Sequence, residues 1–268
     1  MNPIDDAAEA AATLRWWSSA GVTIAVEEAP RNRFDQESAK VAATSPPRVT
    51  PQARETQSES PADRPLPQPA PEAAARALAA SAQNLERLRE TLEQFEGCAL
   101  KKTATQLVFA DGAPGSKVMF VGEAPGGDED RIGRPFVGRA GQLLDRMLRA
   151  IGLDRQQVYI ANVVPWRPPG NRTPTPHETQ ACLPFIRRQI ELAAPEILVC
   201  LGGSATQTLL GAAEGITRTR GKWFTYECDS GRAIRALAMF HPAYLLRQPA
   251  QKRQAWADLR ALATALKS

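Results

Sequence analysis

The chain has 268 residues, 43% of them hydrophobic, and a formal net charge of +4, which together exclude a wholly disordered or fibrous protein. No apolar run approaches the roughly 20 residues that span a bilayer, and the opening residues lack the basic region of a signal peptide. We therefore expect a cytoplasmic protein with no membrane partner, whose four cysteines are reduced.

The N-terminal part of the chain differs in composition from the rest. Residues 7–18 are mostly helix formers and end with Trp16 and Trp17, so we expect residues 1–29 to be a tail with a short amphipathic helix. Residues 30–71 hold nine of the 22 prolines and a single aromatic residue. Such a segment buries too little apolar surface to offset its ordering entropy, which predicts a disordered linker.

Charge is divided unevenly between the two parts of the chain. Residues 1–72 carry eleven acidic and seven basic side chains, whereas residues 73–268 carry 18 acidic and 26 basic ones. We expect residues 72–268 to form one domain, and its basic excess is typical of proteins that meet an anionic partner.

The domain begins with a helical pattern that runs from Glu72 to about Gly97 and should pack through one apolar face. Predicted strands then cover residues 118–122, 158–164, 197–202, 222–227 and 234–240. Predicted helices cover residues 140–151, 177–192, 205–210 and 251–266. This alternation predicts an α/β fold with a parallel sheet covered by helices on both faces.

Polar or glycine-rich residues follow four of these strands, at 122–127, Asn162, 202–204 and 241–247. Ligands collect at the carboxyl ends of parallel strands, so we expect these segments to converge on one rim of the sheet. The glycine spacing in 122–127 does not fit a dinucleotide fingerprint, but its amides could bind an anion or a carbonyl oxygen. An ordinary strand-to-loop turn is the alternative.

Four motifs resemble those of the family four uracil-DNA glycosylases, in the same order and at similar spacing. They are Gly122-Glu-Ala-Pro-Gly, Gly133-Arg-Pro-Phe-Val-Gly-Arg-Ala-Gly-Gln-Leu-Leu, Asn162-Val-Val-Pro-Trp-Arg-Pro-Pro-Gly-Asn-Arg and Phe240-His-Pro-Ala-Tyr-Leu-Leu-Arg. The resemblance implies a three-layer α/β fold with a four-stranded parallel sheet between helices. It also implies a monofunctional hydrolase that cleaves the N-glycosidic bond of deoxyuridine flipped out of DNA and leaves an abasic site.

The resemblance also implies catalytic roles for Glu129, Asn162 and His241. Asn162 would accept from uracil N3–H and donate to O4, and His241 would hydrogen-bond O2 as negative charge develops there. Glu129 would stabilise the sugar cation or orient water. The remaining uracil contacts would come from Phe136, which stacks on the base, and from the loop residues Gly122, Glu123, Ala124 and Gly126, with Glu123 acting mainly through its backbone.

A further group of residues would bind DNA. The resemblance implies that Leu245, Leu246 and Arg247 form a wedge that fills the gap left by the flipped nucleotide, with Arg134 also on the DNA. Core packing of the two leucines is the alternative. The other histidine, His177, matches no functional position, and we expect it on the surface.

The sequence departs from the family at a metal centre. Members typically hold a four-iron, four-sulfur cluster through four cysteines, but Phe95 and Trp166 replace two of these, and only Cys98 and Cys182 remain. Two cysteines cannot hold such a cluster. The other two, in a predicted strand and near a turn, are poor substitutes: Cys200 and Cys228. We therefore expect no metal and no cofactor.

Two classes of function remain open at this point. One is the monomeric glycosylase acting on uracil-containing DNA, with a repair or replication protein as a partner of the tail. The other is a non-catalytic module that recognises uracil or abasic sites. The combination of Glu129, Asn162 and His241 favours the enzyme, because binding alone would not need all three. A related branch binds DNA covalently through a loop histidine, and the stretch 131–134 has none, which indicates turnover.

Overall fold

The computed structural model describes residues 71–267. The predicted tail, residues 1–29, and all but the last residue of the predicted linker, residues 30–71, lie outside the described residues. Within the described part, no helix combines the length and the apolar character needed to cross a membrane.

A six-stranded sheet forms the centre of the domain, in the order β1-β3-β2-β4-β6-β5. The strands are β1 (Asp111–Gly112), β2 (Val118–Gly122), β3 (Tyr159–Asn162), β4 (Ile197–Leu201), β5 (Trp223–Glu227) and β6 (Ala233–Met239). The four central strands are parallel, as predicted, and β1 and β5 add antiparallel edges beyond the expected four. The connection between β5 and β6, residues 228–232, is too short for a parallel crossover, which explains the antiparallel pairing.

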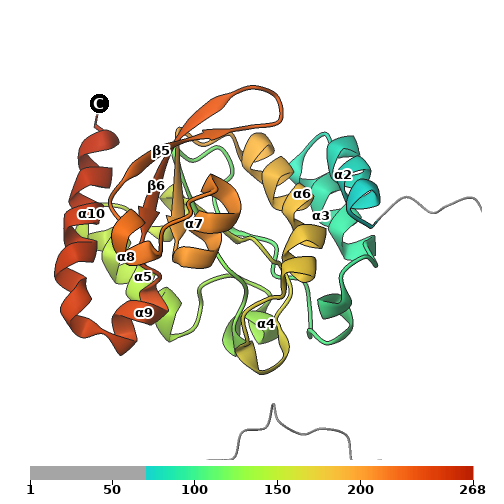
Figure 1. The fold of residues 1–268 in the computed structure, drawn as a ribbon, viewed down its shortest axis with the longest axis horizontal. Coiled ribbons are helices and arrows are strands. Elements are labelled where there is room, and N and C mark those ends of the chain that lie inside the picture. The colour runs from blue at the N-terminus through green and yellow to red at the C-terminus, as the bar shows by residue number, and fades with distance from the viewer. Residues whose placement is uncertain (1–70, 268) are drawn as a thin grey trace, which may run out of the picture. The chain divides into compact units, whose positions relative to one another are not determined.

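Helices cover both faces of this sheet (Figure 1). They are α2 (Pro71–Ser81), α3 (Leu85–Gln94), α4 (Gly127–Ile132), α5 (Arg139–Ala150), α6 (Pro176–Ala193), α7 (Gly203–Leu210), α8 (Ile216–Thr219), α9 (Pro242–Arg247) and α10 (Lys252–Ala265). Alternate residues of β2 enter different cores. Met119 and Val121 pack in the cluster with α2, α3 and α6, whereas Val118 and Phe120 pack in the cluster with α5 and α10. This alternation produces the predicted three layers.

The predicted single helix from Glu72 to Gly97 is wrong, because the chain forms two helices there. Asn84 begins α3, and its side chain accepts a hydrogen bond from the Arg87 amide at 2.8 Å. Leu78 is 41% exposed because α2 packs through a face of small residues instead. These are Ala75 and Ala79, and Ala82, just past the end of the helix, is also buried. Apolar spacing alone did not reveal the helix cap between the two segments.

Candidate active site

A cavity of about 610 Å³ lies at the carboxyl ends of the parallel strands, as predicted. Residues that follow β2, β3, β4 and β6 all line it. Eight of the sequence-predicted site residues are among the lining residues: Glu123, Ala124, Gly126, Glu129, Phe136, Asn162, His241 and Arg247. The volume lies within the range of small-molecule sites and is large enough for a nucleobase.

Asn162 is the last residue of β3 and pairs in parallel register with Gly122, the last residue of β2. Its side chain is buried, and Oδ1 has no hydrogen-bond partner among the described residues. A Cβ atom on Gly122 would lie 2.5 Å from this oxygen and 2.6 Å from Cζ of Phe136, so the approach requires glycine. An unsatisfied buried acceptor costs about 1–3 kcal/mol, which an N–H donor entering the cavity would recover.

Phe136 adopts a left-handed backbone conformation, with φ of 54°. This region is strained for an aromatic residue, and such strain is concentrated at functional sites. The ring is buried and lies 5.4 Å, centroid to centroid, from the ring of His241 at an interplanar angle of 32°. The turn therefore brings an aromatic surface next to the imidazole. The same ring and the Asn162 side chain both lie close to Gly122.

His241 lies two residues past the end of β6, after Phe240, and is the N-cap of α9. Its Nδ1 accepts a hydrogen bond from the Ala243 amide at 3.1 Å, so Nε2 carries the hydrogen in the neutral ring. Burial, assisted by the charge of Arg247, lowers the pKa of His241 to about 4. The imidazole is therefore a neutral hydrogen-bond donor at ordinary pH.

Glu129, in α4, uses its carboxylate to join two loops of the site. Oε2 accepts from the Gly126 amide at 3.1 Å, and Oε1 accepts from the amides of Val137 and Gly138 at 3.0 and 2.9 Å. Although three consecutive acidic residues occupy this segment, Glu129 is only 9% exposed. Three amide donors fix its negative charge at the wall of the cavity.

Glu123, which was predicted to contact uracil mainly through its backbone, lines the same cavity. Its Oε1 is buried without a hydrogen-bond partner among the described residues. Burial raises the pKa of this carboxyl, while hydrogen bonds with Ser204 and Thr173 act in the opposite direction. Asn171 also lines the cavity, with φ of 56°. Its place within the third motif was the only available signal.

Four predicted residues lie outside the cavity lining. Gly122 lies against the side chain of Asn162. The side chain of Arg134 is 59% exposed, and its Nη1 lies 4.0 Å from Oδ2 of Asp111. Leu245 is 1% exposed and belongs to the core, so its prediction as part of a DNA wedge is corrected to the packing alternative. Leu246 is half-buried at the edge of that core.

Comparison with known proteins agrees with these motifs. The family model described as the uracil DNA glycosylase superfamily matches residues 109–260, which include the whole cavity. The chain belongs to the uracil DNA glycosylase superfamily. It is 39% identical over 183 residues to a type-4 uracil-DNA glycosylase of Archaeoglobus fulgidus, a match that covers 66% of this chain and 91% of the relative. It is also 43% identical over 164 residues to a type-4 uracil-DNA glycosylase of Thermotoga maritima, a match that covers 61% of this chain and 83% of that relative.

A more distant relative is a type-5 uracil-DNA glycosylase of Pyrobaculum aerophilum, which is 32% identical over 148 residues. That match covers 48% of this chain and 62% of the relative. The type-4 members of the uracil-DNA glycosylase superfamily are thus the more similar of these relatives, in agreement with the resemblance read from the motifs.

The cluster that family four implies does not fit the residues of this uracil-DNA glycosylase homologue. At the corresponding positions Phe95 and Trp166 are buried, and their side chains share one core with Cys98 and Cys182. The ring of Phe95 lies 4.8 Å from that of Phe185. Residues 71–267 bring together no group of three or more His, Cys, Asp or Glu side chains that could hold a metal ion. Aromatic packing thus occupies positions where metal ligands would stand.

Proposed function

We propose that this chain is a uracil-DNA glycosylase that hydrolyses the N-glycosidic bond of deoxyuridine flipped out of DNA. The observation that carries the proposal is the buried Oδ1 of Asn162, which has no hydrogen-bond partner within residues 71–267 and shares one cavity with the neutral imidazole of His241. In the reaction, the bond between C1′ and N1 breaks with its electron pair on the uracil. The oxygen of a water molecule bonds to C1′, and that water loses a proton.

Asn162 would read the edge of the base. Its Oδ1 would accept from uracil N3–H, and its amide group would donate to O4. Cytosine presents the reverse arrangement at these two positions, so its binding would leave buried polar groups unpaired. Phe136 would stack on the face of the base and limit it to one plane.

The two ends of the breaking bond would be stabilised by different side chains. His241 would donate from Nε2 to O2 of the uracil, where negative charge develops, and the buried environment strengthens this hydrogen bond. Glu129 would place a fixed negative charge beside the sugar cation. Glu123, whose Oε1 has no hydrogen-bond partner in the described part of the chain, would orient the water and accept its proton.

The exposed side chain of Arg247 on α9 would contact the phosphates or the gap left by the flipped nucleotide. Leu246, at the edge of the core, would assist, and Arg134 would contact the backbone. Because the described domain is basic overall, its binding to DNA should weaken steeply as salt increases.

The test is a cleavage assay with the full chain on oligonucleotides that carry a single deoxyuridine, either single-stranded or opposite A or G. Alkali then breaks the strand at any abasic site. We expect cleavage of the uracil strand in at least one of these contexts and none of a thymine control. Tight binding to uracil DNA with no release of free uracil would contradict the proposal and support the non-catalytic module.

The low pKa of His241 predicts the pH dependence of the reaction. Because the donor is the neutral ring, protonation at Nδ1 would break the contact with the Ala243 amide. The ring stays neutral above its pKa of about 4, so the single-turnover rate constant should not show a transition due to His241 near pH 6.5. The measurement is the single-turnover rate constant from pH 8 down to pH 4, for the parent chain and for a variant without His241. A fall to half the maximal rate constant near pH 6.5 that occurs in the parent chain alone would contradict this prediction.

A further inference from the structure

We propose that Arg155 is a positioning residue that holds Phe136 in the geometry needed to stack on uracil. The inference rests on the role proposed for Phe136. Arg155 lies in a short 3₁₀ turn, Arg155–Gln157, just before β3, and it is outside the cavity lining. It would therefore act on the base through Phe136 and not by contact.

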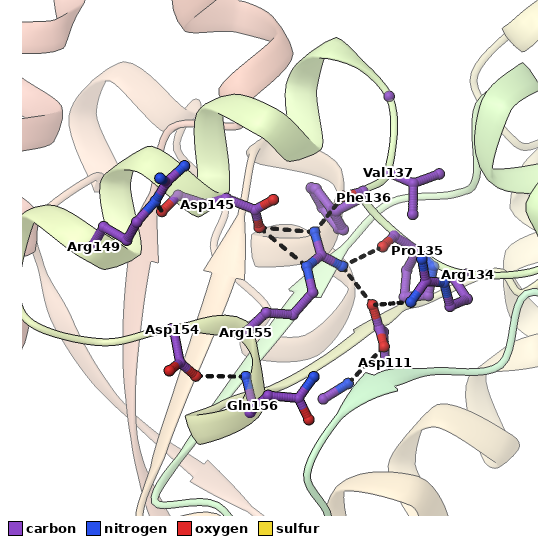
Figure 2. Close-up of polar contacts among 12 residues, drawn as sticks. Asp111, Arg134, Pro135, Phe136, Val137, Asp145, Arg149, Asp154, Arg155 and Gln156 are labelled. Atoms are coloured by element: carbon purple, nitrogen blue, oxygen red, sulfur yellow. Dashed lines mark hydrogen bonds and ion pairs between the residues drawn. The ribbon is translucent and has the colours of Figure 1, made fainter.

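The guanidinium of Arg155 binds two consecutive backbone carbonyls of the site loop (Figure 2). Nη1 donates to the Pro135 oxygen at 3.0 Å, and Nη2 donates to the Phe136 oxygen. One carbonyl belongs to the peptide unit before the left-handed residue Phe136 and the other to the peptide unit after it. The two hydrogen bonds therefore oppose a return of Phe136 to an ordinary backbone conformation.

Two carboxylates fix the guanidinium from opposite sides (Figure 2). Asp111, in β1, accepts from Nη1 at 2.7 Å, while Asp145, in α5, accepts from Nη2 and Nε at 2.9 and 3.1 Å. The Arg155 side chain is 18% exposed, which makes these pairs stronger than surface ones. A lysine could not reproduce this planar, forked set of contacts.

The carbonyl of Phe136 is confined from a second side. A Cβ atom at Gly141, in α5, would lie 1.7 Å from that oxygen, so the helix backbone packs directly against it. Arg155 and α5 therefore hold the same carbonyl, and the ring on the other side of the residue meets His241. A small rotation of this peptide would displace the ring, and misplacement of about 1 Å can cost 10²-fold in rate.

The test is a double-mutant cycle between Arg155→Met and Phe136→Leu, using single-turnover cleavage of uracil DNA well below the melting temperature of every variant. We expect Arg155→Met to lower the rate constant by about tenfold or more, with binding of undamaged DNA unchanged. In the Phe136→Leu background, the same change should have less than about a twofold further effect, because the residue through which Arg155 acts is already lost.

Arg188→Met is the matched control. Arg188 binds the Ala82 carbonyl through Nε and Nη2 at 3.0 and 2.8 Å and pairs with Glu191 at 2.9 Å, on the α2–α6 side of the domain. It should cost comparable stability and leave the rate unchanged. If Arg155→Met does not fold, Asp145→Asn takes its place in the cycle, because it weakens the same contacts.

Three results would overturn the inference in distinguishable ways. Equal rate losses from Arg155→Met and Arg188→Met would mean that only stability is affected. Equal losses in the presence and absence of Phe136 would mean that Arg155 does not act through Phe136, whose own role would stand. A Phe136→Leu variant as fast as the parent chain would overturn both roles, and an inactive parent chain would instead overturn the proposed function.

Discussion

Replacement of His241 by alanine should lower the single-turnover rate constant for uracil release by about 10²–10³-fold, the loss seen when one donor to a developing oxyanion is removed. The physical reason is the fixed tautomer, in which the Ala243 amide occupies Nδ1 and leaves Nε2–H as the donor. Because this hydrogen bond strengthens only as charge develops on the base, the affinity for uracil DNA should change little.

His177→Ala provides the matched control, because the chain has two histidines and His177 is exposed in the first turn of α6. That variant should keep the parent rate. Uracil release at the parent rate by the His241→Ala variant would show that some other group stabilises the leaving base. A weaker binding with an unchanged maximal rate would assign His241 to ground-state recognition only.

Much of the fold could be predicted from local sequence patterns. The predicted strand 118–122 matches β2, and the helices around residues 140–151 and 177–192 match α5 and α6 within two residues. The strand is a continuous apolar run because it is buried on both faces, and each helix shows the apolar periodicity of an element that packs through one face. The edge strand β1 has only two residues, Asp111–Gly112, and no such pattern could reveal it.

The site was predictable only where a motif carried it. The four motifs placed Phe136, Asn162 and His241 around one cavity, because strand ends in a parallel sheet meet at one edge. Contacts between distant segments left no sequence signal. Arg155 reaches Asp111 across 44 positions in the chain, and Glu123 shares the cavity with Thr173 and Ser204, which come from two distant segments.

The buried aromatic residues at the former ligand positions lead to a second large expected effect. Trp166→Ala should reduce the free energy of unfolding by about 3–5 kcal/mol, the usual cost of cutting a large core aromatic to alanine. Trp166 is 2% exposed and shares a core with Phe95, Phe185 and Cys182, so its removal would leave a cavity in that core. Chemical denaturation measures this loss directly.

Trp256→Ala is the control for loss of a tryptophan as such, since Trp256 lies on α10 and is 44% exposed. It should change stability far less than Trp166→Ala. If aromatic burial has replaced metal cross-links, the parent chain should also melt at the same temperature with and without a chelator, and anaerobically purified protein should contain no stoichiometric iron or sulfide. A Trp166→Ala variant as stable as Trp256→Ala would mean that other contacts hold these segments together. Bound iron would mean that Cys98 and Cys182 find further ligands that residues 71–267 do not supply in this arrangement.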